Sequence, residues 1–307
     1  MFSFVSLGLV CVTFFLSCET NHQAEEQQLD TALAIPEKII SNVDAAVLYQ
    51  NDHNTRLSTI GKEKTSFEDK AIHYNVATLT TYINRLEAIS VSKNIPITGV
   101  SFVFGADTYG KRTTFLMPST RNATLDYQES FTVENGQFLT FKHIQKVMKP
   151  RNTSVNDENL VLSPNGYLSF NEATVLFNNY QSQYIQPFAA KVTRDYYTKA
   201  VWYSLEEIKG YINYLQNKSD QYKLAITSID VFFGVYNKDV SLALKSNAQT
   251  VFLVARTQKQ AIVNTNGKSL KTLTQEEFYA KEDITDEDES LAYNLGHLSP
   301  PPPKNNQ

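Results

Sequence analysis

The chain has 307 residues, with 28 Lys+Arg against 32 Asp+Glu, 42% hydrophobic residues and a sequence pI near 5.8. This length suits one large domain or two small ones, and the ordinary apolar fraction excludes a disordered or fibrous chain. A mean hydropathy of −0.32 and the lack of an apolar run of about 20 residues exclude several membrane spans, and the acidic pI argues against nucleic acid as a partner.

The first predicted element is a secretion signal. Residues 2–16 form an apolar stretch of 15 residues, which is too short to cross a bilayer and has the length of a signal-peptide core. The stretch ends in Phe15-Leu16-Ser17-Cys18, which resembles the lipobox of bacterial lipoproteins. The resemblance implies a signal peptide over 1–17 and a lipid on Cys18. An ordinary cleaved signal with a chance cysteine is the alternative.

A polar tether follows the cysteine, over residues 18–36. Glu19 to Gln28 contain no Lys or Arg and no large apolar side chain, which predicts a flexible segment. Within it, Gln23-Ala24-Glu25-Glu26 resembles the acidic surface-export signals of Bacteroidota lipoproteins, although any polar linker would look the same. We expect a protein anchored to the outer membrane by its lipid, on the periplasmic or the outer side. Since no cysteine follows Cys18, disulfides and all-cysteine zinc sites are excluded from the folded body.

The body contains an internal repeat. Lys70 to Gly105 aligns without a gap on Lys199 to Gly234, at an offset of 129 residues, with 12 of 36 positions identical. Average residue usage would give about two identities. A flanking match at an offset of 128 relates Ile40–Asn51 to Leu168–Asn179. The sequence therefore predicts a tandem duplication.

Each copy is predicted to contain two helices and then two strands. The helices are predicted to begin at N-caps, since Ser41, Asn75, Ser169 and Ser204 each precede apolar residues at helical spacing. Alternating apolar residues predict strands over 98–104 and 227–233, and shorter apolar runs predict buried strands over 114–117 and 251–254.

The predicted fold class is α+β, in which a helix-helix-strand-strand unit occurs twice and helices pack on antiparallel sheet. Repeat unit 1 spans 37–165 and repeat unit 2 spans 166–277, with a groove between them. The acidic, proline-rich tail over 278–307 is expected to be disordered or to lie along the surface. Without the acidic ends, residues 31–274 carry 26 Lys+Arg and 20 Asp+Glu, so the body is mildly basic.

The motifs for cofactor or metal chemistry are weak. Gly105 to Arg112 approaches a P-loop, but Arg112 stands where a magnesium-binding hydroxyl is needed and a strand follows, so a basic hairpin turn is expected. The five histidines never lie within ten residues of each other, which excludes the close His pairs typical of zinc enzymes. Asp283 to Glu289 lacks the glycine of a calcium loop. We therefore expect no cofactor, no metal and no catalytic residues.

Two groups of residues are candidates for binding. The second copy has the longer loop between its strands, and the loop opens with Tyr236, Asn237, Lys238 and Asp239, a position suited to recognition. Asn84 and Asn213 are identical in the two copies and interrupt apolar helix stripes. They could contact a ligand, or they could bond a helix to a strand.

The repeat motifs, together with Trp-Tyr-Ser-Leu-Glu-Glu-Ile over 202–208 and the strand ending in Phe-Phe-Gly, resemble uncharacterised lipoproteins of flavobacteria. The resemblance implies a location and supplies no catalytic residue. The leading hypothesis is a non-enzymatic, lipid-anchored envelope protein that binds a protein or glycan partner. An envelope hydrolase, with a site assembled from residues distant in sequence, and a purely structural envelope component are the alternatives.

Overall fold

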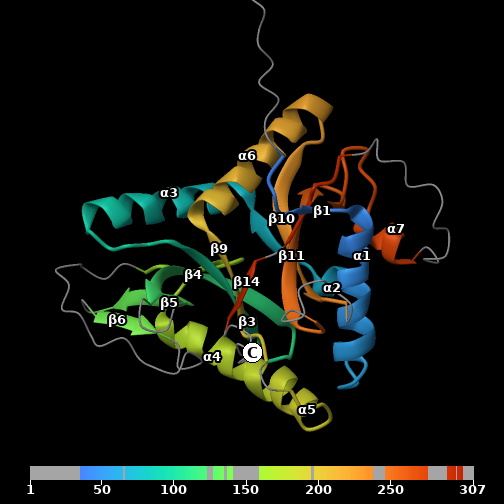
Figure 1. Ribbon diagram of the computed structural model, residues 1–307, viewed down its shortest axis with the longest axis horizontal. Helices are drawn as coiled ribbons and strands as arrows, with labels where there is room; N and C mark the ends of the chain where they lie inside the picture. Colours follow the sequence, from blue (N-terminus) through green and yellow to red (C-terminus); the bar gives the residue numbers. More distant parts are fainter. Residues whose placement is uncertain are drawn as a thin grey trace, which may run out of the picture. The chain divides into compact units, whose positions relative to one another are not determined.

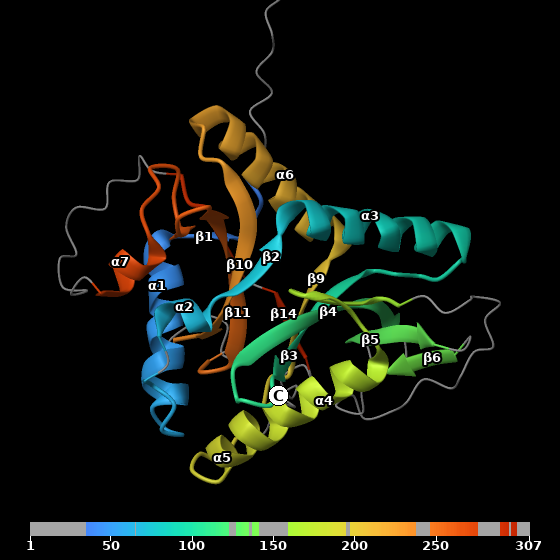
Figure 2. The ribbon, with the colours of Figure 1, turned by 180° about the vertical axis from the view of Figure 1, so that it is seen from behind.

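A computed structural model describes residues 35–64, 66–122, 127–134, 137–140, 159–194, 197–237, 246–275, 289–294 and 296–299 (Figures 1 and 2). All of these residues belong to the second of two units, Met1–Ala34 and Ile35–Gln307. The predicted signal peptide, Cys18 and nearly all of the tether lie outside the described residues.

The described strands form two antiparallel sheets. The first contains β1 (Ile39–Ile40), β2 (Ile72–Asn75), β10 (Ile226–Val235), β11 (Gln249–Thr257), β12 (Ala261–Ile262) and β13 (Ala292–Tyr293). Their order is β1–β13–β11–β10–β2, with β12 beside β11. The second contains β3 (Gly99–Ala106), β4 (Arg112–Asn122), β5 (Tyr127–Glu134), β6 (Gln137–Thr140), β7 (Val161–Ser163), β8 (Gly166–Leu168), β9 (Ala200–Ser204) and β14 (His297–Ser299). Their order is β14–β9–β3–β4–β5–β6, with β7 beside β4 and β8 beside β7.

Helices cover both sheets, which confirms the α+β class (Figure 1). The helices are α1 (Asn42–Asn51), α2 (Phe67–Lys70), α3 (Val76–Ser92), α4 (Phe170–Tyr180), α5 (Gln186–Ala189), α6 (Leu205–Tyr222) and α7 (Leu270–Gln275). Two π-helical turns, η1 (Asp52–Leu57) and η2 (Gln181–Ile185), continue α1 and α4. Helix α1 packs on β10 and α4 packs on β3, while α3 and α6 contact each other.

Each sheet takes strands from both predicted repeat units. Strand β2 pairs with β10, with Asn75 opposite Ser228, and β9 pairs with β3, with Ser204 opposite Gly99. The two pairings are equivalent in the repeat, because the 129-residue offset relates Asn75 to Ser204 and Gly99 to Ser228. Each unit thus supplies one short strand, β2 or β9, that pairs with a long strand of the other unit. A common origin of the two units remains an inference from the sequence.

The helix starts follow the predicted caps. The hydroxyls of Ser169 and Ser204 accept the backbone N–H of Glu172 and Glu207, whose carboxylates bond back to the cap, so both capping boxes are complete. Ser41 caps α1 and Asn75 caps α3. The P-loop-like segment is the turn of the β3–β4 hairpin, as expected.

Two copy-invariant glycines allow a helix to lie close to a sheet. A Cβ atom at Gly234 would lie 2.9 Å from the Cβ of Leu48 on α1, and one at Gly105 would lie 3.2 Å from the Cβ of Leu176 on α4. The two helix–strand contacts correspond to each other through the repeat offsets. At Gly234 a side chain would force α1 away from the strand, whereas at Gly105 the contact would be tight and α4 would have to shift slightly.

One continuous apolar core joins the two sheets. At its centre the rings of Phe104 on β3 and Phe233 on β10, which are equivalent in the repeat, meet edge to face with centroids 4.9 Å apart. Tyr180 stacks on Phe233 with centroids 5.8 Å apart. The polar centre described below lies beside these rings.

The structure corrects two expectations about strands. The helix-helix-strand-strand pattern misses β2 and β9, which precede the second helix of each unit. Each is only 4 or 5 residues long, and its partner strand comes from the other unit, so local periodicity gives it little support.

The other correction concerns the tail. Residues 289–294 and 296–299 were expected to be disordered or superficial, but Leu291, Ala292 and Tyr293 are buried. Strand β13 pairs with β1 and β11, and β14 pairs with β9. The segment Leu291–Leu298 is a short apolar stretch within an acidic and proline-rich region, and averaging over the whole tail conceals it. The remainder of the tail, including its prolines, lies outside the described residues.

Candidate functional site

The four loop residues predicted to bind a partner differ in their surroundings. Tyr236 is buried, and its hydroxyl donates to Asn294 Oδ1 at 3.2 Å, so it belongs to the core. Asn237 is exposed and accepts a hydrogen bond from Asn51 Nδ2 at 2.7 Å. Lys238 and Asp239 lie outside the described residues.

Asn84 and Asn213 were expected to interrupt the apolar stripes of their helices, and this expectation is wrong. Both side chains are exposed, on α3 and α6. The apolar faces of these helices are formed by their neighbours, such as Tyr82, Ile83, Tyr211 and Ile212. Neither asparagine lines any of the cavities described below.

A buried polar centre lies where the two predicted units meet. Arg112, at the start of β4, donates two hydrogen bonds to Asp52 on η1, at 3.0 and 2.6 Å. Gln249 Nε2 donates to the same carboxylate at 3.2 Å, and Tyr180 donates to Gln249 Oε1 at 2.7 Å. Such a bidentate pair is the strong form of an Arg–carboxylate contact. The carboxylate of Asp52 therefore accepts three hydrogen bonds.

Arg112 keeps its charge in this centre. Burial would lower the pKa of its guanidinium, but Asp52 more than compensates and the pKa is raised. The guanidinium carbon also lies 4.4 Å from the ring centroid of Phe233. The Asp52–Arg112 pair is thus a fixed ion pair.

Two further cations are buried around this pair. The exposed fractions are 2% for Asp52, 6% for Arg56, 7% for Lys70 and 7% for Arg112, so three cations surround one buried carboxylate. Arg56 lies over the ring of Phe188, 4.0 Å from its centroid, and burial lowers its pKa. The other two buried carboxylates of the described chain are used elsewhere: Glu129 is on β5, and Asp230 binds His73 and Arg256.

Lys70, at the end of α2, has a neutral partner. Its Nζ lies 3.1 Å from Nδ1 of His53 and 5.3 Å from the ring centroid of Tyr49. Burial, and then repulsion by Arg112, lowers the pKa of Lys70. Burial and Lys70 lower the pKa of His53. An ammonium has no lone pair, so Nδ1 accepts and the neutral His53 ring carries its proton on Nε2.

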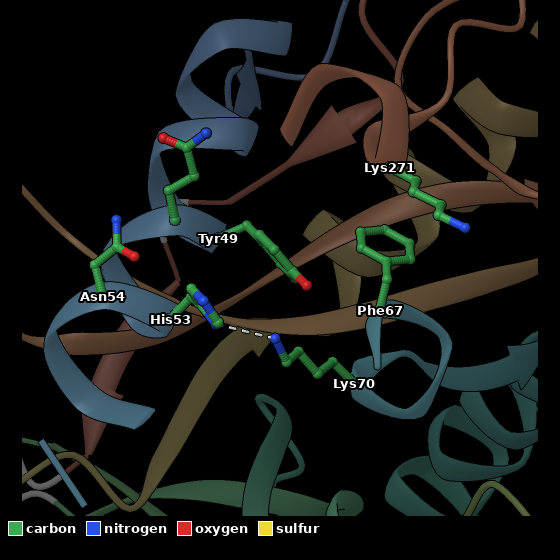
Figure 3. Close-up of a pocket in the computed structure, with 7 residues that line it drawn as sticks. Tyr49, His53, Asn54, Phe67, Lys70 and Lys271 are labelled. Atoms are coloured by element: carbon green, nitrogen blue, oxygen red, sulfur yellow. Dashed lines mark hydrogen bonds between the residues drawn. The ribbon is translucent and has the colours of Figure 1, made fainter. Parts of the chain in front are cut away.

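Two cavities open on either side of Lys70. The first, of about 400 Å³, is lined by Tyr49, Gln50, His53, Asn54, Phe67, Lys70 and Lys271. Figure 3 shows Lys70 reaching from α2 to His53, with Phe67 and Lys271 on the side of the cavity opposite Asn54. The second, of about 290 Å³, is lined by Leu57, Lys70, Tyr109, Gly110, Lys111, Arg112 and Tyr184. Both combine rings with cations, and residues from both predicted units line the second.

The cavities beside Lys70, a small one at Arg56 and a fourth beside Ser219 and Asp220 hold neither two carboxylates nor a Ser–His pair among their lining residues. The exposed His73 contacts the buried carboxylate of Asp230 at 2.6 Å across the β2–β10 pairing, and Arg256 binds the same carboxylate. Within the described ranges, no group of three His, Cys, Asp or Glu side chains could hold a metal ion.

Comparisons of the chain with protein-family models, with curated proteins and with solved structures gave no match. The site therefore rests on its own geometry.

Some of its residues were visible in the sequence, but their proximity was not. Lys70 is identical to Lys199 in the repeat, and Arg112 ends the P-loop-like turn. The useful signal is a difference between the copies: the offsets of 128 and 137 align Asp52 with Tyr180 and Arg112 with Gln249. The charged pair Asp52–Arg112 of the first copy therefore corresponds to the neutral pair Tyr180–Gln249 of the second, and Gln249 bonds Asp52.

Proposed function

We propose that the protein is a lipid-anchored envelope protein of the outer membrane whose folded body is a non-enzymatic binding module. The ligand seat is the pair of cavities beside Lys70, and the partner is a protein or a glycan. The observation that carries the proposal is the buried ammonium of Lys70, which lies between two cavities and has only a histidine nitrogen as its hydrogen-bond partner within the described chain.

The anchor is proposed from the apolar stretch over 2–16 and from Ser17-Cys18, and the tandem repeat is proposed to be a duplication. In the described part of the chain, no helix combines the length and the apolar composition that crossing a membrane requires. A lipid on Cys18 would attach the body without such a helix.

Metabolic labelling with a fatty acid tests the anchor. The wild-type chain is expected to take up the label and a Cys18→Ala variant to lose it. Label retained by the variant would contradict the lipobox interpretation.

Binding is tested by blocking the first cavity. Asn54 is exposed and lines this cavity, so Asn54→Trp would fill it, whereas Asn84→Trp adds the same ring to the exposed face of α3 as a matched control. Full-length protein in detergent is applied to a glycan array and to immobilised envelope proteins. Retention is expected for wild type and Asn84→Trp and loss for Asn54→Trp. Equal retention by all three, or none by the wild type, would contradict the proposed seat.

A further inference from the structure

Among the described residues, three buried cations and one buried carboxylate lie around the two cavities, and the half-buried Glu63 is close enough to act on His53. Arg56, Lys70 and Arg112 are buried with Asp52 as their buried carboxylate, and that carboxylate already accepts from Arg112 and Gln249. Burying an ionised group without an opposite charge is costly, and an anionic ligand would offset that cost.

Lys70 is the cation best placed to receive a ligand. An ammonium carries three N–H donors, and one of them is used by His53. That bond is its single hydrogen bond among the described residues, so two donors remain. Lys70 also lines both cavities, whereas Arg56 lines a third of only about 10 Å³, which is at the lower limit for one water molecule.

The geometry points to a ligand that carries an oxyanion, a carboxylate, sulfate or phosphate, bound to Nζ of Lys70 between the two cavities. We infer this as a deepening of the proposed function, on which it rests. His53 lines the first cavity, and its neutral ring carries a second N–H donor on Nε2. An oxyanion there would meet charged and neutral donors together, which is the strong form of hydrogen bonding.

The surroundings suit the rest of such a ligand. The first cavity, of about 400 Å³, falls in the size range of small-ligand sites. The rings of Tyr49 and Phe67, with centroids 5.3 Å apart, line it together with the amides of Gln50 and Asn54. Ring faces and amides are the groups that contact a sugar ring, so an acidic saccharide is the organic form of ligand that fits. The net positive charge of residues 31–274 would attract it.

Lys199 provides a matched control. It corresponds to Lys70 in the repeat and is half-buried, with its pKa lowered by burial. It lines none of the cavities described above. Lys70→Met and Lys199→Met therefore remove the same charge from equivalent places, one inside the proposed seat and one outside it.

The experiment titrates full-length protein in detergent with inorganic sulfate, inorganic phosphate, D-glucuronate and D-glucose, at constant ionic strength, by calorimetry. Glucuronate and at least one inorganic oxyanion are expected to bind and glucose to give no heat. Lys70→Met should weaken the binding about tenfold or more, and Lys199→Met should leave it unchanged. Without ligand, Lys70→Met should melt at the same temperature as wild type or higher, because it removes an unbalanced buried charge.

Each outcome has a fixed meaning. Tighter binding of glucuronate than of the inorganic ions supports an acidic saccharide, and equal binding supports a free oxyanion. No binding of any anion, or binding that Lys70→Met leaves unchanged, overturns the inference. If that happens while Asn54→Trp still abolishes retention on the array, the binding module stands with a neutral ligand. If both experiments fail, the proposed function fails as well.

Discussion

Asp52 holds together the most highly charged part of the interior. It accepts two hydrogen bonds from Arg112 and one from Gln249, and Arg56 and Lys70 lie close by. Removing a carboxylate from a buried pair leaves its partner charged and without compensation. The negative charge of Asp52 therefore stabilises the buried cations around it.

We therefore expect Asp52→Ala to lower the free energy of unfolding by about 3–5 kcal/mol, measured by urea denaturation. The double variant Asp52→Leu with Arg112→Met should recover most of that loss, because it removes both charges and keeps the volume filled. A loss below about 1 kcal/mol in Asp52→Ala, the range of exposed ion pairs, would show that the pair is not isolated from water.

His53 should make stability depend on pH. Burial, and then the charge of Lys70, lower its pKa below the usual 6.5, against opposing effects of Asp52 and Glu63. The unfolded chain then binds more protons than the folded chain between the folded pKa and 6.5, so the unfolding free energy falls as the pH falls through this window.

The measurement compares wild type with His53→Gln. The melting temperature of the variant, relative to wild type, is expected to rise between about pH 7.5 and about pH 5, because glutamine does not titrate. A constant difference over this range would mean that His53 has the same pKa in both states.

Residue-level reasoning from the sequence reached the types of these side chains but not their assembly. Lys70 is identical to Lys199 in the repeat, and Arg112 occupies the position where a P-loop has a serine or threonine. His53 was noted only as an isolated histidine. Asp52 and Arg112 are 60 positions apart, and Gln249 is 197 positions from Asp52. A single sequence carries no signal that joins residues at such separations.

At the scale of elements, helices α1 and α4 lie on their strands at Gly234 and Gly105. A Cβ at Gly234 would also lie 3.2 Å from Phe252 Cδ1, so the added methyl group meets atoms on two sides. By contrast, Gly210 lies within α6, and a Cβ there would meet nothing within 4 Å. Substitution by alanine is therefore expected to have opposite effects on stability at Gly234 and at Gly210.

Gly234→Ala is expected to destabilise the protein by about 1–3 kcal/mol, because α1 must move away from β10. Gly210→Ala is expected to stabilise it by about 0.5–1 kcal/mol, since alanine is the better helix former. Thermal or chemical denaturation measures both. Equal effects of the two substitutions would contradict the close packing of α1 on the sheet.

The longer helices α1, α3, α4 and α6 and the strands β3, β4, β10 and β11 could be predicted from the sequence because their signals are local. Caps such as Ser204 and Glu207 lie within three residues of each other, and the stripe from Leu205 to Leu215 repeats at the helical period. Strands β2 and β9 were missed because they are short and because their partners β10 and β3 belong to the other unit. Pairing of this kind depends on tertiary contacts.

At the scale of the whole molecule, residues 289–294 and 296–299 contribute one strand to each of the two sheets. Strand β13 joins the first sheet and β14 joins the second. Tyr293 stacks on Tyr211 with centroids 4.5 Å apart, and Tyr211 donates to the backbone oxygen of Leu291 at 2.8 Å. The sequence predicted the opposite, because acidic residues and prolines surround this short apolar stretch.

A chain that ends at residue 288 is therefore expected to lose at least about 3 kcal/mol of unfolding free energy, the cost of removing one large buried aromatic side chain. The matched control ends at residue 299 and keeps both strands, and it should melt close to the full-length protein. Melting curves measure both. Similar stability of the two shortened chains would contradict the tail's place in the core.

The central claim is that the seat beside Lys70 receives an oxyanion. Selenate, a sulfate analogue with strong anomalous scattering, locates such a site directly in a crystal. The account predicts an anomalous peak within hydrogen-bond distance of Lys70 Nζ in the wild-type protein, about 3 Å away, and its loss in Lys70→Met. Selenate bound only at other positions, with none at Lys70, would contradict it.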